Sequence, residues 1–78
     1  MGVETYIKLL EKKGFKISKA DDKEIEFVRG DDWIKIERKF YPTGREYYLL
    51  TVYRKGVKIE KTFYDLTDAF REAFYKLS

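Results

Sequence analysis

The chain has 78 residues and a formal net charge of +3, with 44% hydrophobic, 18% aromatic and 40% charged residues. This length predicts a single domain spanning residues 1–78, whose core depends on Phe and Tyr side chains. Cysteine and histidine are both absent, which excludes disulfides, thiolate metal sites, the commonest general base and the best nucleophile.

The chain also contains no Asn and no Gln, and Lys and Glu dominate its charged residues. That bias is typical of hyperthermophile proteins, so we expect a thermostable domain. A designed protein can carry the same bias, and the sequence leaves both origins open. No apolar run reaches the length of a membrane span, and residues 1–4 do not resemble a signal peptide. We therefore expect a cytoplasmic protein that does not bind membranes.

Residues 3–13 are expected to form the first helix. Val3, Ile7 and Leu10 recur at helical spacing with Tyr6 beside them, and charged side chains lie on the other side of the helix: Glu4, Lys8, Glu11 and Lys12. Lysines near the end favour a helix C-terminus, and Gly14 is a good stop signal. The chain therefore begins with an amphipathic helix.

Five runs of alternating residues follow, and each is expected to form a strand. Residues 20–23 form the first turn and residues 30–32 break the chain again. Residues 42–44, Pro-Thr-Gly, suit a three-residue hairpin loop, and residues 55–56, Lys-Gly, suit a two-residue loop. The expected strands cover residues 15–17, 24–27, 33–41, 46–54 and 57–64.

A second helix is expected at the C-terminal end, capped by Asp65 or Thr67. Its apolar stripe consists of Leu66, Ala69, Phe70, Ala73, Phe74 and Leu77. The sequence therefore predicts an α+β fold in the order α-β-β-β-β-β-α. We expect an antiparallel meander of about five strands with the N-terminal and C-terminal helices packed on one face.

The two hairpin loops predict which side chains share a face, because directly paired residues point the same way. The 55–56 loop pairs Val52 with Ile59, and the 42–44 loop pairs Ile36 with Leu50. One face then collects a predicted core that both helices cover: Ile34, Ile36, Phe40, Tyr48, Leu50, Val52, Val57, Ile59 and Phe63. Arg38 and Lys61 fall on the same face, where we expect them near an edge.

The opposite face has no helix left to cover it, and we call it the open face. It collects Trp33, Lys35, Glu37, Lys39, Tyr47, Leu49, Thr51, Tyr53, Lys58, Glu60, Thr62 and Tyr64. Rings between lysines on a bare sheet can stack bases while ammonium groups contact phosphates. We therefore expect a small binding module for nucleic acid, with Lys16 adding charge. The predicted binding residues are Trp33, Lys35, Lys39, Arg45, Tyr47, Tyr53, Lys58 and Tyr64.

Two other interpretations of the open face remain. Tyr and Trp are enriched at protein interfaces, so the same residues suit a protein partner or a homodimer. Cross-strand aromatic pairs can also simply stiffen a sheet. Glu37 and Glu60 favour these interpretations because carboxylates repel phosphate.

The stretches Val52-Tyr-Arg54-Lys-Gly56 and Lys61-Thr62-Phe63 precede a helix with Ala69 and Ala73. This pattern, confined to residues 46–78, resembles the hairpin-plus-helix ending of integrase arm-binding domains. In that family a three-stranded sheet lies in the DNA major groove and the helix packs behind it. The resemblance implies that DNA is contacted by Lys35, Lys39, Arg45, Tyr47, Tyr53 and Lys58. The element order also resembles double-stranded-RNA-binding domains, but Asp65 and Asp68 stand where their second helix begins with basic residues.

We do not expect an enzyme. The sequence lacks a glycine-rich phosphate loop and zinc-ligand spacing, so we expect no cofactor and no metal. Glu37-Arg38-Lys39 with Asp31 or Asp32 upstream resembles the acid and Glu-x-Lys arrangement of restriction-endonuclease-like nucleases, which bind magnesium. The chain looks too short for that fold, and Asp is common in turns because it bonds its own backbone.

Overall fold

The first helix ends in a tight turn that directs the chain into the sheet. In the computed structural model, which describes residues 2–76, α1 spans Val3–Lys12. Gly14 follows with a φ of +95°. The amides of Gly14 and Phe15 donate to the carbonyls of Glu11 and Leu10 at 3.0 and 3.2 Å, which is the Schellman arrangement. Phe15 thereby enters the core, where it is 2% exposed.

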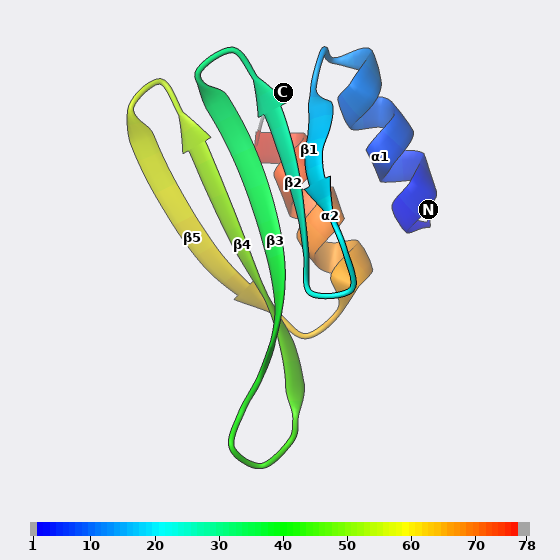
Figure 1. Cartoon of the computed structure of the whole chain (residues 1–78), viewed down its shortest axis with the longest axis vertical. Coiled ribbons are helices and arrows are strands. Elements are labelled where there is room, and N and C mark those ends of the chain that lie inside the picture. The colour runs from blue at the N-terminus through cyan, green and yellow to red at the C-terminus, as the bar shows by residue number, and fades with distance from the viewer. Residues whose placement is uncertain (1, 77–78) are drawn as a thin grey trace.

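Five antiparallel strands and a second helix complete the chain (Figure 1). The strands are β1 Lys16–Ala20, β2 Glu24–Arg29, β3 Asp32–Phe40, β4 Glu46–Arg54 and β5 Val57–Phe63. Each strand pairs with the next one along the chain, so the sheet is a meander in the order β1-β2-β3-β4-β5. Helix α2, Leu66–Lys76, follows, and the Asp65 carboxylate accepts the Thr67 amide at 2.8 Å. The predicted fold class is confirmed.

The two hairpin loops have the predicted geometry. Lys55 and Gly56 both have positive φ, 52° and 80°, as a type I′ turn requires. The β4–β5 register pairs Val52 with Ile59, and the β3–β4 register pairs Ile36 with Leu50. Both predicted registers are therefore confirmed, and with them the division of side chains between the two faces.

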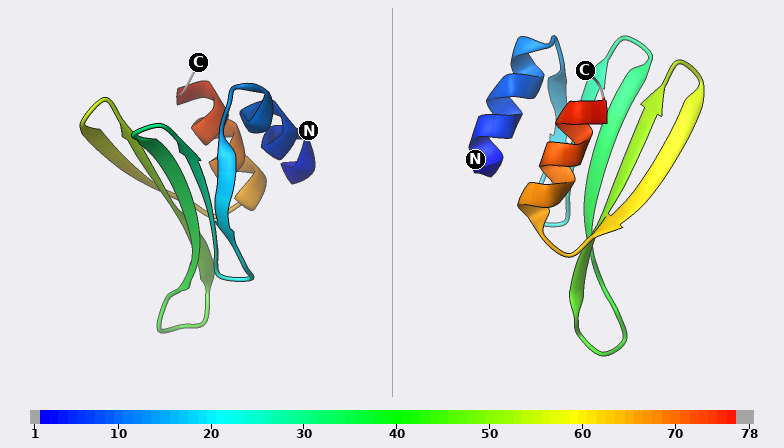
Figure 2. Two further views of the ribbon diagram at one scale, coloured as in Figure 1. Left: turned by 45° about the horizontal axis from the view of Figure 1, so that its top comes forward. Right: turned by 180° about the vertical axis from the view of Figure 1, so that it is seen from behind.

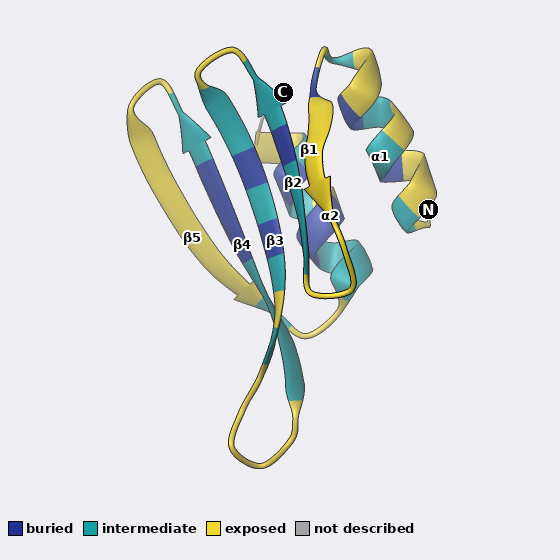
Figure 3. Ribbon diagram, viewed as in Figure 1, coloured by how far each residue is buried: buried dark blue, intermediate teal, exposed yellow. Residues whose placement is uncertain are grey.

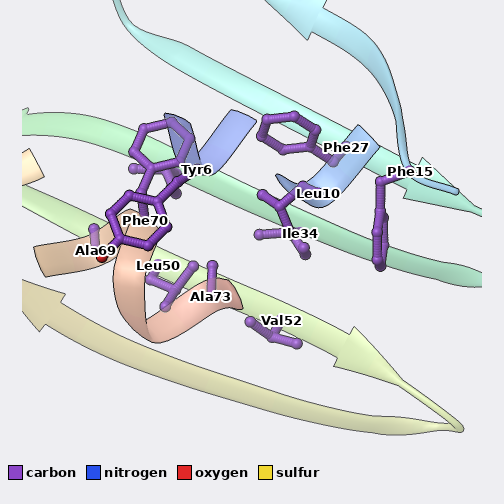
Figure 4. Packing of buried hydrophobic residues seen from close by; sticks show 11 residues of the cluster. Tyr6, Leu10, Phe15, Phe27, Ile34, Leu50, Val52, Ala69, Phe70 and Ala73 are labelled. Atoms are coloured by element: carbon purple, nitrogen blue, oxygen red, sulfur yellow. The ribbon is translucent and has the colours of Figure 1, made fainter. Parts of the chain in front are cut away.

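Both helices pack on one face of the sheet (Figure 2). The core between them forms from aromatic and aliphatic side chains, with Phe27 and Phe70 in an edge-to-face contact of 6.3 Å (Figure 4). Such pairs add stability beyond the burial of their area. The buried cluster consists of Tyr6, Leu10, Phe15, Phe27, Ile34, Ile36, Leu50, Val52, Ala69, Phe70 and Ala73.

The helices cover less of their face than the sequence predicts. Phe40, Val57 and Ile59 point to the helix side, yet they are 58%, 59% and 39% exposed. Their assignment to the core was wrong. The reason is that α2 lies over the middle of the sheet, whereas β5 and the tip of the β3–β4 hairpin extend beyond both helices (Figure 3). Leu77, predicted for the α2 stripe, lies outside the described residues.

Arg38 and Lys61, the charged residues that the sequence predicts near an edge of the helix face, do lie at its margins. Lys61 on β5 pairs with Glu72 on α2 at 2.5 Å, and Arg38 pairs with Glu46 on the protruding hairpin. Their stems add to the apolar surface while the charged groups reach solvent. Within residues 2–76, neither helix has the length and apolarity needed to cross a membrane.

Candidate functional site

The open face is bare, as the register predicts. Figure 1 views the molecule from this side, with α2 behind the sheet. The β2 register adds Glu24, Glu26 and Val28 to this face, and the β1 register adds Lys16 and Lys19. No helix within residues 2–76 covers these side chains, so they are available to a partner.

At one end of the open face, two rings stack between lysines. Trp33 on β3 and Tyr53 on β4 are parallel within 8°, with centroids 5.7 Å apart. The register places Lys58 beside Tyr53, and Val28 and Lys16 beyond Trp33. We call Lys16, Val28, Trp33, Tyr53 and Lys58 the Trp33 row. It contains no carboxylate, so its rings lie in a positively charged setting.

Additional positive charge approaches Trp33 from the next row. The Lys35 ammonium lies 5.8 Å from the Trp33 ring centroid, within cation–π range. Four of the predicted site residues, Trp33, Lys35, Tyr53 and Lys58, therefore lie together at this end.

At the other end, two tyrosines of the protruding β3–β4 hairpin meet Tyr64, which directly follows β5. Tyr41 stacks on Tyr47 at 4.4 Å, and the hydroxyls of Tyr41 and Tyr64 share a hydrogen bond of 3.3 Å. The Arg45 guanidinium lies 4.4 Å over the Tyr64 ring, and Lys39 pairs with Tyr47 across the strands. We call Tyr41, Tyr47 and Tyr64, with Lys39 and Arg45, the tyrosine cluster.

Tyr41 was missing from the predicted site, although its position beside the 42–44 loop carried a usable signal. A three-residue loop pairs Tyr41 with Arg45, and the Tyr41 amide donates to the Arg45 carbonyl at 2.8 Å. This pairing brings Tyr41 close to Tyr47. The hydrogen bond to Tyr64 raises the pKa of Tyr41 above its usual value, so its hydroxyl stays neutral at physiological pH.

The middle of the open face is charge-compensated. The Glu37 carboxylate lies 3.8 Å from the Lys35 ammonium and 3.7 Å from that of Lys39. The Ser18 hydroxyl donates to the Glu26 carboxylate at 2.8 Å. Thr51, between Lys35 and Glu60 in the register, is only 3% exposed. Two of the predicted phosphate-binding lysines therefore already contact a carboxylate.

Near the β1 edge, Glu24 pairs with Lys19 at 2.6 Å. The hydrogen bond and the negative charge of Glu24 raise the pKa of Lys19. The predicted site thus divides into two groups of rings and cations. They are separated by six residues of β3, roughly 20 Å along an extended strand.

The structure does not assemble the nuclease-like set of carboxylates. Asp32 points to the helix face, where it accepts the Lys55 amide at 3.2 Å and lies 3.7 Å from Arg29. Glu37 lies on the open face, five residues away. In the part of the chain that the structure describes, no three acidic side chains converge in a way that would hold a metal.

A cavity on the helix side was not predicted from the sequence. It has a volume of about 260 Å³ and lies between the starts of both helices and the β1–β2 turn, with Val3, Ile7 and Phe70 in its lining. The Asp21 carboxylate in its rim accepts the amides of Lys23 and Glu24, both at 2.8 Å. Those two bonds lower the pKa of Asp21. This carboxylate stabilises its own turn and is not aimed at a ligand.

Comparison with protein-family models, with curated proteins and with solved structures gave no match for this chain. The geometry of the open face is therefore the basis for assigning a function.

Proposed function

We propose that the open face binds single-stranded nucleic acid, with bases stacking at the Trp33 row and at the tyrosine cluster. The observation that supports this function is the pairing of rings with cations at both ends of the face. At each end the rings form stacked pairs, 5.7 Å apart for Trp33–Tyr53 and 4.4 Å for Tyr41–Tyr47. Unpaired bases expose π faces that such rings can stack on, whatever the base.

Phosphate contacts would come from cations that have no carboxylate partner. Lys16, Arg45 and Lys58 form no ion pair within residues 2–76. Two of them lie in the Trp33 row and the third in the tyrosine cluster. Three phosphate contacts to a single strand give a slope of log affinity against log salt of about −2. We therefore expect the affinity to fall as the salt concentration rises, with a modest slope.

The test is a titration of fluorescently labelled oligonucleotides followed by anisotropy. Trp33→Leu and Tyr47→Leu each remove one stacking ring, and each is expected to lower single-strand affinity roughly tenfold to hundredfold. Phe40→Leu is the matched control. Phe40 is on the same strand as Trp33 and is 58% exposed, but it points to the opposite face. This control is expected to leave the affinity unchanged.

Three outcomes would contradict the proposal: no binding at low salt, binding insensitive to Trp33→Leu, or an equal loss in Phe40→Leu. The same titration with duplex oligonucleotides separates two binding modes. Tighter binding of duplex than of single strands would favour the major-groove mode that the integrase-type resemblance implies.

A protein partner is the second candidate, favoured by the charge-compensated middle of the open face. Glu37 already compensates part of the charge of Lys35 and Lys39, and the neighbouring Thr51 is buried. Such a surface suits a partner with mixed charges. This function predicts a complex that tolerates salt, and an open-face homodimer would be weakened by Trp33→Leu. Sedimentation of this variant without nucleic acid tests that alternative.

A further inference from the structure

The outer edge of β5 is a regular, uncovered strand edge. β5 pairs only with β4, and its seven residues keep an uninterrupted register. In Figure 2 both helices lie toward the β1 end of the sheet, and neither runs along the outer edge of β5. The other edge strand, β1, has five residues, an irregularity between Ile17 and Lys19, and α1 beside it (Figure 1). Irregular short edges resist pairing, whereas long regular ones invite it.

The hairpin geometry shows which backbone groups of β5 point outward. In a two-residue hairpin the pair next to the turn, here Arg54 with Val57, exchanges backbone hydrogen bonds, and such pairs alternate along the ladder. Val57, Ile59 and Lys61 therefore use their amides and carbonyls toward β4. The amides and carbonyls of Lys58 and Glu60 point away from the sheet. They have the spacing that an added antiparallel strand requires.

Four side chains of β5 are also either exposed to solvent or without an ion pair among residues 2–76. Val57 and Ile59 are 59% and 39% exposed on the helix face. Lys58 and Glu60, on the open face, form no ion pair within residues 2–76. Glu60 thus differs from Glu24, Glu26 and Glu37, whose carboxylates all have partners. β5 therefore carries both exposed apolar side chains and charged side chains without an ion pair.

We propose that two copies of this chain pair through their β5 edges as antiparallel strands, with Ile59 of both copies at the two-fold axis. In this register Lys58 lies opposite Glu60 of the partner subunit, and Glu60 lies opposite the partner subunit's Lys58. Two opposite-charge pairs form on the open face, and both are in hydrogen-bonded positions of the ladder. On the helix face the two Ile59 side chains meet, and Val57 packs on the stem of the partner's Lys61.

Charge selects this register over its neighbours. A symmetric antiparallel pair must place one residue opposite its own copy. Shifting the axis to Lys58 or to Glu60 puts two like charges directly opposite each other, which is unfavourable. The axis at Ile59 is flanked on both sides by opposite charges. The exposed edge therefore specifies a second copy of itself rather than any extended strand.

The dimer joins two five-stranded sheets into one sheet with a continuous open face. The two Trp33 rows would then lie on the same side of this sheet. Lys58 is used for the partner's Glu60 in this arrangement, and Lys16 remains as the unpaired cation of the row. This proposal uses the edge and not the rings, and it shares only Lys58 with the proposed nucleic-acid surface.

Sedimentation of the full chain over a wide concentration range tests the dimer. The wild type is expected to dimerise reversibly. Lys58→Glu and Glu60→Lys each place like charges opposite each other, and each is expected to weaken association roughly tenfold or more. The double variant Lys58→Glu/Glu60→Lys restores opposite charges and is expected to recover the dimer. Lys16→Glu, a matched charge change on the β1 edge, is expected to leave association unchanged.

Disulfide crosslinking tests the register of the two β5 strands and does not require a measurement of dimer affinity. The chain has no cysteine, so Ile59→Cys adds one thiol at the axis and is expected to oxidise to a covalent dimer. In Val57→Cys the two copies of residue 57 would lie roughly 13 Å apart, too far for a disulfide. A monomeric wild type, association insensitive to the single charge variants, or equal crosslinking at both positions would overturn the proposal. Circular dichroism of each variant is the control for an intact fold.

Discussion

The Glu37 carboxylate lies between two lysines in the middle of the open face. Its oxygens are 3.8 and 3.7 Å from the ammonium groups of Lys35 and Lys39. Glu24 is its direct neighbour on β2. Because Glu37 holds both lysines, it reduces the positive charge that a phosphate would meet. It therefore separates the two cationic ends of the face.

Glu37→Gln is expected to strengthen single-strand binding roughly threefold to tenfold and to steepen the salt slope by about 1, because two ammonium groups become available. Stability is expected to change by less than about 0.5 kcal/mol, since two partly exposed ion pairs are exchanged for relief of the Glu24–Glu37 repulsion. Anisotropy of labelled oligonucleotides at several salt concentrations measures the affinity and the salt slope, and urea unfolding measures the stability.

The control for Glu37→Gln is Glu72→Gln, which removes a carboxylate from α2 on the far side of the sheet. The hydrogen bond from Lys61 lowers the pKa of Glu72, so the Glu72 carboxylate is charged at neutral pH. Equal effects of the two variants on binding, or weaker binding in Glu37→Gln, would show that the open face does not contact phosphates.

At the scale of elements, the connections determine where the side chains point. Gly14 ends α1 with a φ of +95°, and a Cβ at this position would lie 3.3 Å from Arg29 Cδ. The Arg29 guanidinium donates to the Lys13 carbonyl at 2.9 Å and lies 4.3 Å from the Phe15 ring centroid. This turn and Arg29 together tie the C-terminus of α1 to the sheet, where the helix dipole favours a cation.

Gly14→Ala is expected to destabilise the fold by about 1–2 kcal/mol, because an L-residue is strained in the left-handed region. Gly14→Asn adds a Cβ at the same place but tolerates that conformation better, so its loss is expected to be smaller. Urea unfolding followed by circular dichroism gives the two midpoints. Equal losses in both variants would show that steric contact with Arg29, and not backbone strain, dominates.

The elements and their registers could be predicted from the sequence because the turns have few solutions. Lys55-Gly56 permits a two-residue loop, and this alone determines which residues of β4 and β5 share a face. How much of the sheet the two helices cover could not be predicted in the same way. Whether Val57 and Ile59 are buried depends on where α2 crosses the sheet, which is a property of the packed core and not of any local pattern.

Most residues of the candidate site could be predicted from the sequence, but the contacts between their side chains could not. Parity along β3 and β4 places Trp33 beside Tyr53 and Lys39 beside Tyr47. It does not reveal that Glu37 contacts both Lys35 and Lys39, since that depends on side-chain rotamers. It also left out Tyr41, which lies at the end of the strand and stacks on Tyr47. These contacts leave two ring clusters with a charge-compensated region between them.

At the scale of the whole molecule, the helices lie to one side of the sheet and leave two features uncovered. The first is the open face with its rings and cations, and the second is the β5 edge (Figure 3). We proposed a different partner for each, a nucleic acid strand for the face and a second copy for the edge. Because the two surfaces share only Lys58, variants at Trp33 and at Glu60 separate the two functions.

The most direct test of the account is to map amide chemical-shift changes on adding a short single-stranded oligonucleotide at low salt. We expect the largest shifts at Val28, Trp33, Tyr47 and Tyr53, with little change at Phe70 and Ala73 on the helix side. Shifts concentrated on the helices, or no shifts at low salt, would contradict the claim that the open face is the nucleic-acid-binding surface.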